Sequence, residues 1–195
     1  PPAPGDARLA LYSGNFGRKQ GLGQIIDAAD ELARRNAGVR IRMRGNGSER
    51  TALESGVAAR GLSNVEICDL LPKERFSAGL AEGDIHLVPQ DPSVADYAVP
   101  SKIYAIMAAG RPFVATAKPG STLWRMQDET GAFLCVPPND PAALADAILS
   151  LAGDSDLRGK LGERARRYVT ENCAKTDSLS RLIGVIREGR PASAV

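Results

Sequence analysis

The chain has 195 residues, of which 43% are hydrophobic and 25% are charged. This composition excludes disordered, collagen-like and disulfide-scaffold proteins, and the length predicts one domain with at most a short appendage. The formal net charge of +2 gives no sign of a nucleic-acid partner. Three cysteines lie far apart and only one histidine accompanies them, so we expect no zinc site, and reduced thiols in a cytosolic protein. Neither a signal peptide nor a membrane-spanning run is visible.

Short apolar runs alternate with amphipathic stretches along the chain. The runs predict strands at 9–12, 39–43, 65–68, 85–88, 113–115 and 133–136. The amphipathic stretches predict helices at 22–35, 49–60, 73–81, 101–109, 122–127, from Pro141 onward, 156–170 and 174–188. This alternation is typical of right-handed βαβ units, so we expect an α/β fold: a Rossmann-like, doubly wound parallel sheet of about six strands with helices on both faces. Residues 1–8 are interpreted as a linker and residues 9–190 as one domain, which ends in helices at 156–188.

The most informative segment joins the first strand to the first helix. It reads Ser13-Gly14-Asn15-Phe16-Gly17-Arg18-Lys19-Gln20-Gly21-Leu22-Gly23, a glycine-rich turn whose amides and basic side chains suit an anion. The spacing of a Walker A loop is missing from it. A dinucleotide fingerprint is disfavoured as well, because the second strand ends in Arg44-Gly45 rather than in the acidic residue that holds a ribose.

Three segments together resemble the C-terminal, donor-binding domain of family 4 glycosyltransferases, which have the GT-B fold. They are the glycine turn at 14–22, the turn Arg44-Gly45-Asn46-Gly47, and the stretch from Val99-Pro100-Ser101-Lys102 to Met107-Ala108-Ala109-Gly110-Arg111-Pro112. The nearest subgroup is that of bacterial exopolysaccharide transferases similar to colanic-acid fucosyltransferases. The resemblance covers nearly the whole chain and implies one half of a GT-B enzyme, with the N-terminal acceptor-binding domain of the same polypeptide absent from this chain.

The resemblance implies a retaining, metal-independent enzyme without a metal or other cofactor, which transfers a hexose or deoxyhexose from a UDP- or GDP-linked donor. It implies a role in cell-surface polysaccharide synthesis, in the cytoplasm or peripherally at the inner membrane. The isolated domain is expected to be inactive, because the catalytic residues belong mainly to the other half. Two alternatives remain: a domain of a GT-B sugar-nucleotide epimerase, which relies on additional carboxylates and histidines, and a non-catalytic Rossmann-like binding module.

The two glycine-containing turns supply the first candidate binding residues. Gly14 matches the family glycine whose missing side chain lets the backbone approach the phosphates or the sugar. Asn15 and Gln20 stand where the family usually has arginine and lysine, and the long stem of Lys19 can reach a diphosphate instead. Gly45 lies in a turn that relatives use near the nucleotide, with a plain tight turn as the alternative.

The stretch before the fourth helix supplies the remaining candidates. Many relatives carry two glutamates eight positions apart here, and this chain has Tyr97 and Ala105 in those places. We expect Ser101 and Lys102, at the start of a helix, to bind the phosphate in their stead. The alternatives are that Ser101 caps the helix and that Lys102 is a solvated surface side chain. Asp96 is the candidate for a sugar hydroxyl.

Overall fold

Six parallel strands form one sheet in the order β3-β2-β1-β4-β5-β6. Their bounds are Leu9–Ser13 (β1), Arg40–Arg44 (β2), Val65–Cys68 (β3), Ile85–Val88 (β4), Phe113–Thr116 (β5) and Leu134–Val136 (β6). The structure, a computed structural model, describes residues 8–93 and 99–172. The strand order reverses between β1 and β4, and doubly wound sheets bind ligands at the carboxyl ends of the strands beside such a point. The expected sheet is therefore confirmed, and it indicates where a site belongs.

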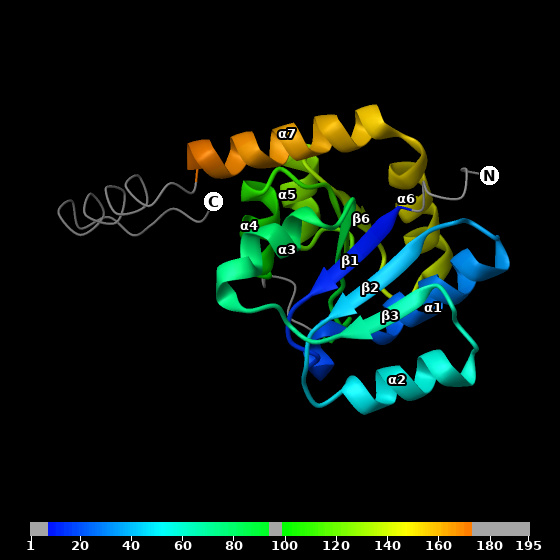
Figure 1. Ribbon diagram of the computed structural model, residues 1–195. Coiled ribbons are helices and arrows are strands. Elements are labelled where there is room, and N and C mark those ends of the chain that lie inside the picture. The colour runs from blue at the N-terminus through cyan, green and yellow to red at the C-terminus, as the bar shows by residue number, and fades with distance from the viewer. Residues whose placement is uncertain (1–7, 94–98, 173–195) are drawn as a thin grey trace.

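Helices cover both faces of the sheet (Figure 1). One face carries α1 (Gly23–Arg34), α2 (Arg50–Ala59) and α6 (Pro141–Gly153), and the other carries α3 (Phe76–Ala81), α4 (Lys102–Ala108), α5 (Thr122–Thr130) and α7 (Ser155–Asn172). Two short 3-10 turns, η1 (Arg18–Gln20) and η2 (Lys73–Arg75), lie in the connections. Each face packs on its own hydrophobic cluster. The helix expected at 174–188 and most of the expected linker lie outside the described residues.

Local signals set the ends of the helices. Asp140 caps α6, because its side chain accepts a hydrogen bond from Ala143 N at 2.9 Å, and Pro141 occupies the first turn as predicted. Helix α5 runs to Thr130, beyond the expected end at 127. It stops there because Gly131 adopts a left-handed conformation with φ of 53°.

The apolar stripe of α1 faces the core with one exception. The spacing of apolar residues over 22–35 predicts six residues on this stripe: Leu22, Ile25, Ile26, Ala29, Leu32 and Ala33. The prediction for Ala33 is wrong, since this residue is exposed. Gln24 and Ala28 are buried instead, because α1 packs against α6 as well as against the sheet. A buried glutamine in the first turn of α1 is thus the unexpected feature of this helix.

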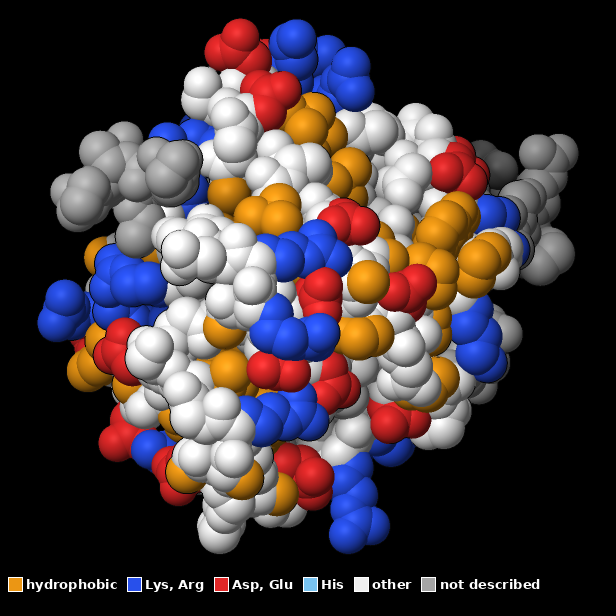
Figure 2. Space-filling view, turned by 90° about the vertical axis from the view of Figure 1, so that its right-hand side faces the viewer, with side chains coloured by type: hydrophobic (Ala, Val, Ile, Leu, Met, Phe, Trp, Pro, Cys, Tyr) orange, Lys and Arg blue, Asp and Glu red, His pale blue; other side chains and the backbone are white. Residues whose placement is uncertain are grey.

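The surface mixes charges of both signs. On the face shown in Figure 2, basic and acidic side chains lie next to one another rather than in separate fields. Ion pairs among the described residues include Arg60 with Asp27 at 2.7 Å and Arg34 with Glu31 at 2.7 Å. Across residues 8–93 and 99–172, no helix combines the length and the apolar character needed to cross a bilayer.

The single histidine is a core residue, as its place in an apolar strand predicts. His86 lies on β4, is 1% exposed, and its Nε2 is 3.0 Å from Leu80 O. Because the carbonyl oxygen can only accept, Nε2 carries the proton. Burial lowers the pKa of His86 to about 4.

Acidification from pH 7 to pH 4 is expected to remove about 3 kcal/mol of stability through His86 alone. As the pH falls below 6.5, the ordinary pKa, His86 becomes protonated in the unfolded chain. In the folded chain it stays neutral down to about pH 4, so the unfolded state is favoured in between. Urea unfolding of the unaltered chain and of His86→Gln at both pH values measures this, because the glutamine amide still donates to Leu80 O and does not titrate. Equal losses in the two proteins would contradict the prediction.

Candidate functional site

Two turns at the carboxyl ends of β1 and β2 are joined by backbone hydrogen bonds. Gly14 N donates to Arg44 O, and Phe16 N donates to Asn46 O, both at 2.9 Å. Glu49 N donates back to Phe16 O at 2.9 Å. The Phe16 side chain is fully buried beneath this ladder. The turns at 14–17 and 45–49 therefore form one structural unit.

Close packing explains the glycine at position 45. A Cβ added there would lie 2.0 Å from Gly14 O and 2.5 Å from the Phe16 ring. No side chain fits at this distance from a backbone oxygen, so Gly45 is needed for the two turns to meet. Gly45 therefore has a packing role against Gly14, and its place near a nucleotide stays a prediction.

The ladder occupies part of the main chain that was expected to bind an anion. Four amides of the glycine turn donate to backbone carbonyls: those of Gly14, Phe16, Gln20 and Gly21. Within the described ranges, five other amides of the turn at 14–22 have no acceptor: those of Asn15, Gly17, Arg18, Lys19 and Leu22. Only this second group of amides is free to bind a ligand. Fewer backbone amides are therefore available for an anion than the glycine-rich sequence predicts.

The ammonium group of Lys102 lies over the glycine turn. Its Nζ is 4.1 Å from the centre of the Tyr12 ring and donates to Gln20 Oε1 at 3.1 Å. A Cβ at position 14 would come within 3.0 Å of the same Nζ, so Gly14 leaves the space that the ammonium occupies. The structure thus brings together three of the predicted site residues, Gly14, Gln20 and Lys102, at the carboxyl end of β1.

Lys102 is a largely buried cation without a partner of opposite charge among the described residues. Its contacts there are the π face of Tyr12 and the amide oxygen of Gln20. Burial lowers the pKa of Lys102 to about 8, so the side chain is still mainly charged at neutral pH. The solvated-surface interpretation of Lys102 is therefore wrong. A buried ammonium with no carboxylate beside it suits a bound anion.

Tyr12 is a site residue that sequence reasoning missed. Its side chain is buried within the hydrophobic cluster on the α1 face, and its place in the apolar run at 9–12 predicts only a core residue of the strand. Besides supporting Lys102, its hydroxyl donates to Asn15 O at 2.7 Å and lies 3.4 Å from Gln20 Oε1. The only signal in the sequence was an aromatic residue two positions before the first glycine of the turn.

The other predicted residues of the glycine turn lie at its rim. Asn15 is exposed, and its side chain covers Gly17 and Gly47, where added Cβ atoms would fall 3.0 and 2.6 Å away. Lys19 is also exposed, while its carbonyl accepts from Asp91 N at 3.1 Å. Both side chains are accessible to a ligand from solvent.

The segment before α4 is described only in part. Ser101 precedes α4 and is exposed, and its side chain makes no capping hydrogen bond, so the capping interpretation fails. Ala105 is half-buried against the cluster on the α4 face. Asp96 and Tyr97 lie outside the described residues.

Arg44 belongs to the fold rather than to the site. It is 4% exposed, and its guanidinium donates to Glu82 Oε2 at 2.5 Å and to Gly79 O at 3.1 Å. The hydrogen bond from Arg44 is the main cause that holds the pKa of Glu82 below its usual value. Arg44 therefore ties β2 to α3 and has a structural role.

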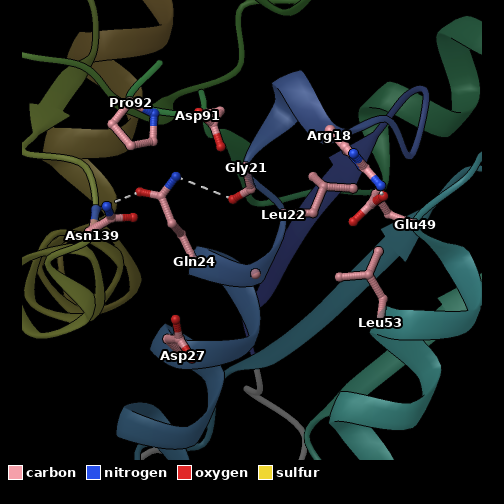
Figure 3. A pocket seen from close by; sticks show the side chains of 11 residues that line it. Arg18, Gly21, Leu22, Gln24, Asp27, Glu49, Leu53, Asp91, Pro92 and Asn139 are labelled. Carbon is pink, nitrogen blue, oxygen red and sulfur yellow. Dashed lines mark hydrogen bonds and ion pairs between the residues drawn. The ribbon is translucent and has the colours of Figure 1, made fainter. Parts of the chain in front are cut away.

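A groove of about 360 Å³ adjoins the glycine turn beside the first turn of α1 (Figure 3). Its charged side chains already have partners within the protein. Glu49 pairs with Arg18 at 3.6 Å, and Asp27 pairs with Arg60 at 2.7 Å. Asp91 accepts from Ser93 N at 2.8 Å. In the part of the chain that the structure describes, no three histidine, cysteine, aspartate or glutamate side chains gather as metal ligands do.

The sequence matches the family described as "Glycosyl transferases group 1" over residues 7–154. WcaI of Escherichia coli strain K12, whose name assigns it to colanic acid biosynthesis as a glycosyl transferase, is 34% identical over 185 residues, 94% of this chain and 44% of WcaI. WbjE of Pseudomonas aeruginosa, named as a glycosyltransferase, is 30% identical over 180 residues, 92% of this chain and 44% of WbjE. The chain therefore spans less than half the length of these curated relatives.

A solved structure shares the fold. The crystal structure of the C-terminal domain of a group 1 glycosyl transferase from Francisella tularensis superposes with a TM-score of 0.65 at 19% identity. The match covers 85% of this chain and 85% of that one. At this identity the likeness concerns the arrangement of the sheet and helices.

Proposed function

The chain belongs to the group 1 glycosyltransferases as their C-terminal, donor-binding GT-B domain, and on this premise we propose that it binds a UDP- or GDP-linked sugar for a retaining, metal-independent transferase. The parent enzyme would transfer a hexose or deoxyhexose in cell-surface polysaccharide synthesis, in the cytoplasm or peripherally at the inner membrane. The acceptor would enter from the N-terminal half of the same polypeptide. The name of WcaI, which refers to colanic acid biosynthesis, supports the polysaccharide part of this proposal.

One observation carries the proposal: the buried ammonium of Lys102 beside the glycine turn. It lies next to Gly14 at the point where the strand order reverses. No carboxylate among the described residues neutralises it, so a diphosphate would supply the missing charge. The free amides of Arg18 and Lys19 open the same turn and suit a second phosphate contact.

The chemistry that these groups support is electrostatic. When the glycosidic bond of the donor breaks, negative charge grows on the departing nucleoside diphosphate. A fixed cation and fixed amide dipoles at that position stabilise the charge without having to reorganise. Lys102 is already held in place by Tyr12 and Gln20, and its side chain is only partly exposed to solvent. The domain would therefore contribute leaving-group stabilisation, while the acceptor and its activation belong to the other half.

Calorimetric titration of the chain with UDP, GDP and their sugars tests the proposal. We expect one base to be preferred and the diphosphate to raise Tm, because a ligand that binds only the folded state stabilises it. Affinity in EDTA should equal affinity in Mg²⁺, and the domain alone should transfer no sugar. Absence of both heat and thermal shift with every one of these ligands at millimolar concentration would overturn the proposal.

A further inference from the structure

The side-chain amide of Gln24 joins three loops at the carboxyl edge of the sheet. Its Nε2 donates to Gly21 O at 3.2 Å and to Gln90 O at 2.9 Å. Its Oε1 accepts from Asn139 N at 2.8 Å. Figure 3 shows the amide between Gly21 on one side and Asn139 on the other. The loops that follow β1, β4 and β6 are thus held by one side chain that is 7% exposed.

The Gln24 amide contacts the same turn that Lys102 contacts. Gly21, the end of η1, has φ of 59°, and a Cβ there would lie 2.6 Å from Gln24 Nε2. The neighbouring Asp91 N donates to Lys19 O at 3.1 Å. The same turn also receives the hydrogen bond from Lys102 Nζ to Gln20 Oε1. Hydrogen bonds from both Lys102 and the Gln24 amide therefore hold the turn at 18–21.

We propose that Gln24 is a positioning residue for the donor: its amide fixes the turn at 18–21 and, through Gln20, the place of the Lys102 ammonium. This inference rests on the proposed function, because the diphosphate is the group for which Lys102 is placed. Loss of the amide would leave the backbone N–H of Asn139 without its acceptor. Gly21 O and Gln90 O would each lose one of two donors, because they also accept from Gln24 N and from Thr116 Oγ1. The turn would then shift away from the β4 loop, and the free amides of Arg18 and Lys19 would shift with it.

The variant Gln24→Met removes all three hydrogen bonds while keeping the length of the side chain and adding no charge. We expect its Kd for UDP or GDP, whichever the unaltered chain prefers, to rise at least about fivefold at 15 °C, since misplaced contacts weaken binding steeply. The NMR signals of the ¹³C-labelled Lys102 side chain should shift in the same variant without ligand. A merely structural role would lower Tm and leave the Kd of the folded protein unchanged.

The matched control is Gln127→Met on α5. Gln127 Oε1 accepts from Cys135 N at 3.1 Å, so this variant also breaks a hydrogen bond that a backbone amide donates to a helix glutamine, but away from the turn. We expect a lower Tm and a Kd within about twofold of the unaltered chain, because distant sites act independently.

The conservative variant Gln24→Glu keeps the acceptor for Asn139 N and replaces the amide donor by a carboxylate facing two carbonyls. Its affinity, relative to the unaltered chain at each pH, should recover as the pH falls from 7 to 5, because the protonated carboxyl supplies one donor again. If Gln24→Met fails to fold, Gln24→Glu still tests whether Gln24 positions the turn at 18–21 for the donor. Unchanged Kd in Gln24→Met or Gln24→Glu, with Tm lowered, would overturn the positioning role alone. Failure of the unaltered chain to bind any nucleotide would overturn the proposed function and this inference with it.

Discussion

Replacing Lys102 with methionine is expected to weaken nucleoside diphosphate binding about 10- to 100-fold. A hydrogen bond from a charged group contributes about 1.5–3 kcal/mol, and each 1.4 kcal/mol is a factor of ten in Kd. Methionine keeps an apolar stem over the Tyr12 ring, so the change removes the charge with little loss of packing. Calorimetric titration with UDP and GDP at pH 7 measures the effect. The control is Lys160→Met on an exposed position of α7, which should leave Kd within about twofold.

The pH dependence of binding provides a second test of the same contact. Since the pKa of Lys102 is about 8 in the free protein, the ammonium is mostly charged at pH 7 and mostly neutral at pH 9. An anion binds the charged form, so Kd should rise about tenfold between these pH values. Lys102→Met should show no such rise. A Kd that is the same at pH 7 and pH 9 in the unaltered chain, or the same slope in both proteins, would remove Lys102 from the site.

Substitution of Gly45 by alanine is expected to have the largest effect on stability. The added Cβ would lie 2.0 Å from Gly14 O, a backbone atom that cannot rotate away. Separating the two turns breaks the ladder from Gly14 to Arg44 and from Phe16 to Asn46. We expect a loss of at least about 3 kcal/mol in the free energy of unfolding, the upper range for overpacked sites.

A helical glycine is the matched control for Gly45→Ala. Gly159 lies within α7, and nothing is within 4 Å of the position of its Cβ. Gly159→Ala should raise stability by about 0.5–1 kcal/mol through helix propensity alone. Urea unfolding of both variants at pH 7 decides between the two effects. A Gly45→Ala protein as stable as the unaltered chain would show that the two turns do not meet as described.

The order of strands and helices follows from the sequence because long periodic segments dominate it. Apolar runs such as the one at 85–88 and stripes such as the one in α1 leave few alternatives for the fold. The ends of helices were harder to predict than their existence. Helix α5 runs to Thr130 because it ends at the left-handed Gly131, and the apolar pattern alone does not mark that residue as the end. Ala33 was misplaced because a helical stripe gives no information on a second packing partner, here α6.

The site was predictable only where charge or glycine marks it. Lys102 and Gly14 were found from their motifs, and the structure places them beside each other. Tyr12 and Gln24 were missed because their contacts join segments far apart in sequence. The packing of Gly45 against Gly14 O could not be predicted from the sequence, because it joins the turns of two different strands. Residue type predicted the candidate ligand-binding groups, while the side chains that hold them required the three-dimensional arrangement.

The candidate site joins elements from the two helical layers, one on each face of the sheet. Lys102 begins a helix packed on one face of the sheet, whereas the turn bearing Gly14 and Gln20 leads into a helix packed on the other. A diphosphate held by both would act as a non-covalent cross-link between two otherwise separate hydrophobic clusters. Occupancy would then make the domain melt more cooperatively and would slow amide hydrogen exchange on both faces of the sheet at once. Binding of the substrate would thus require both helical layers to be folded.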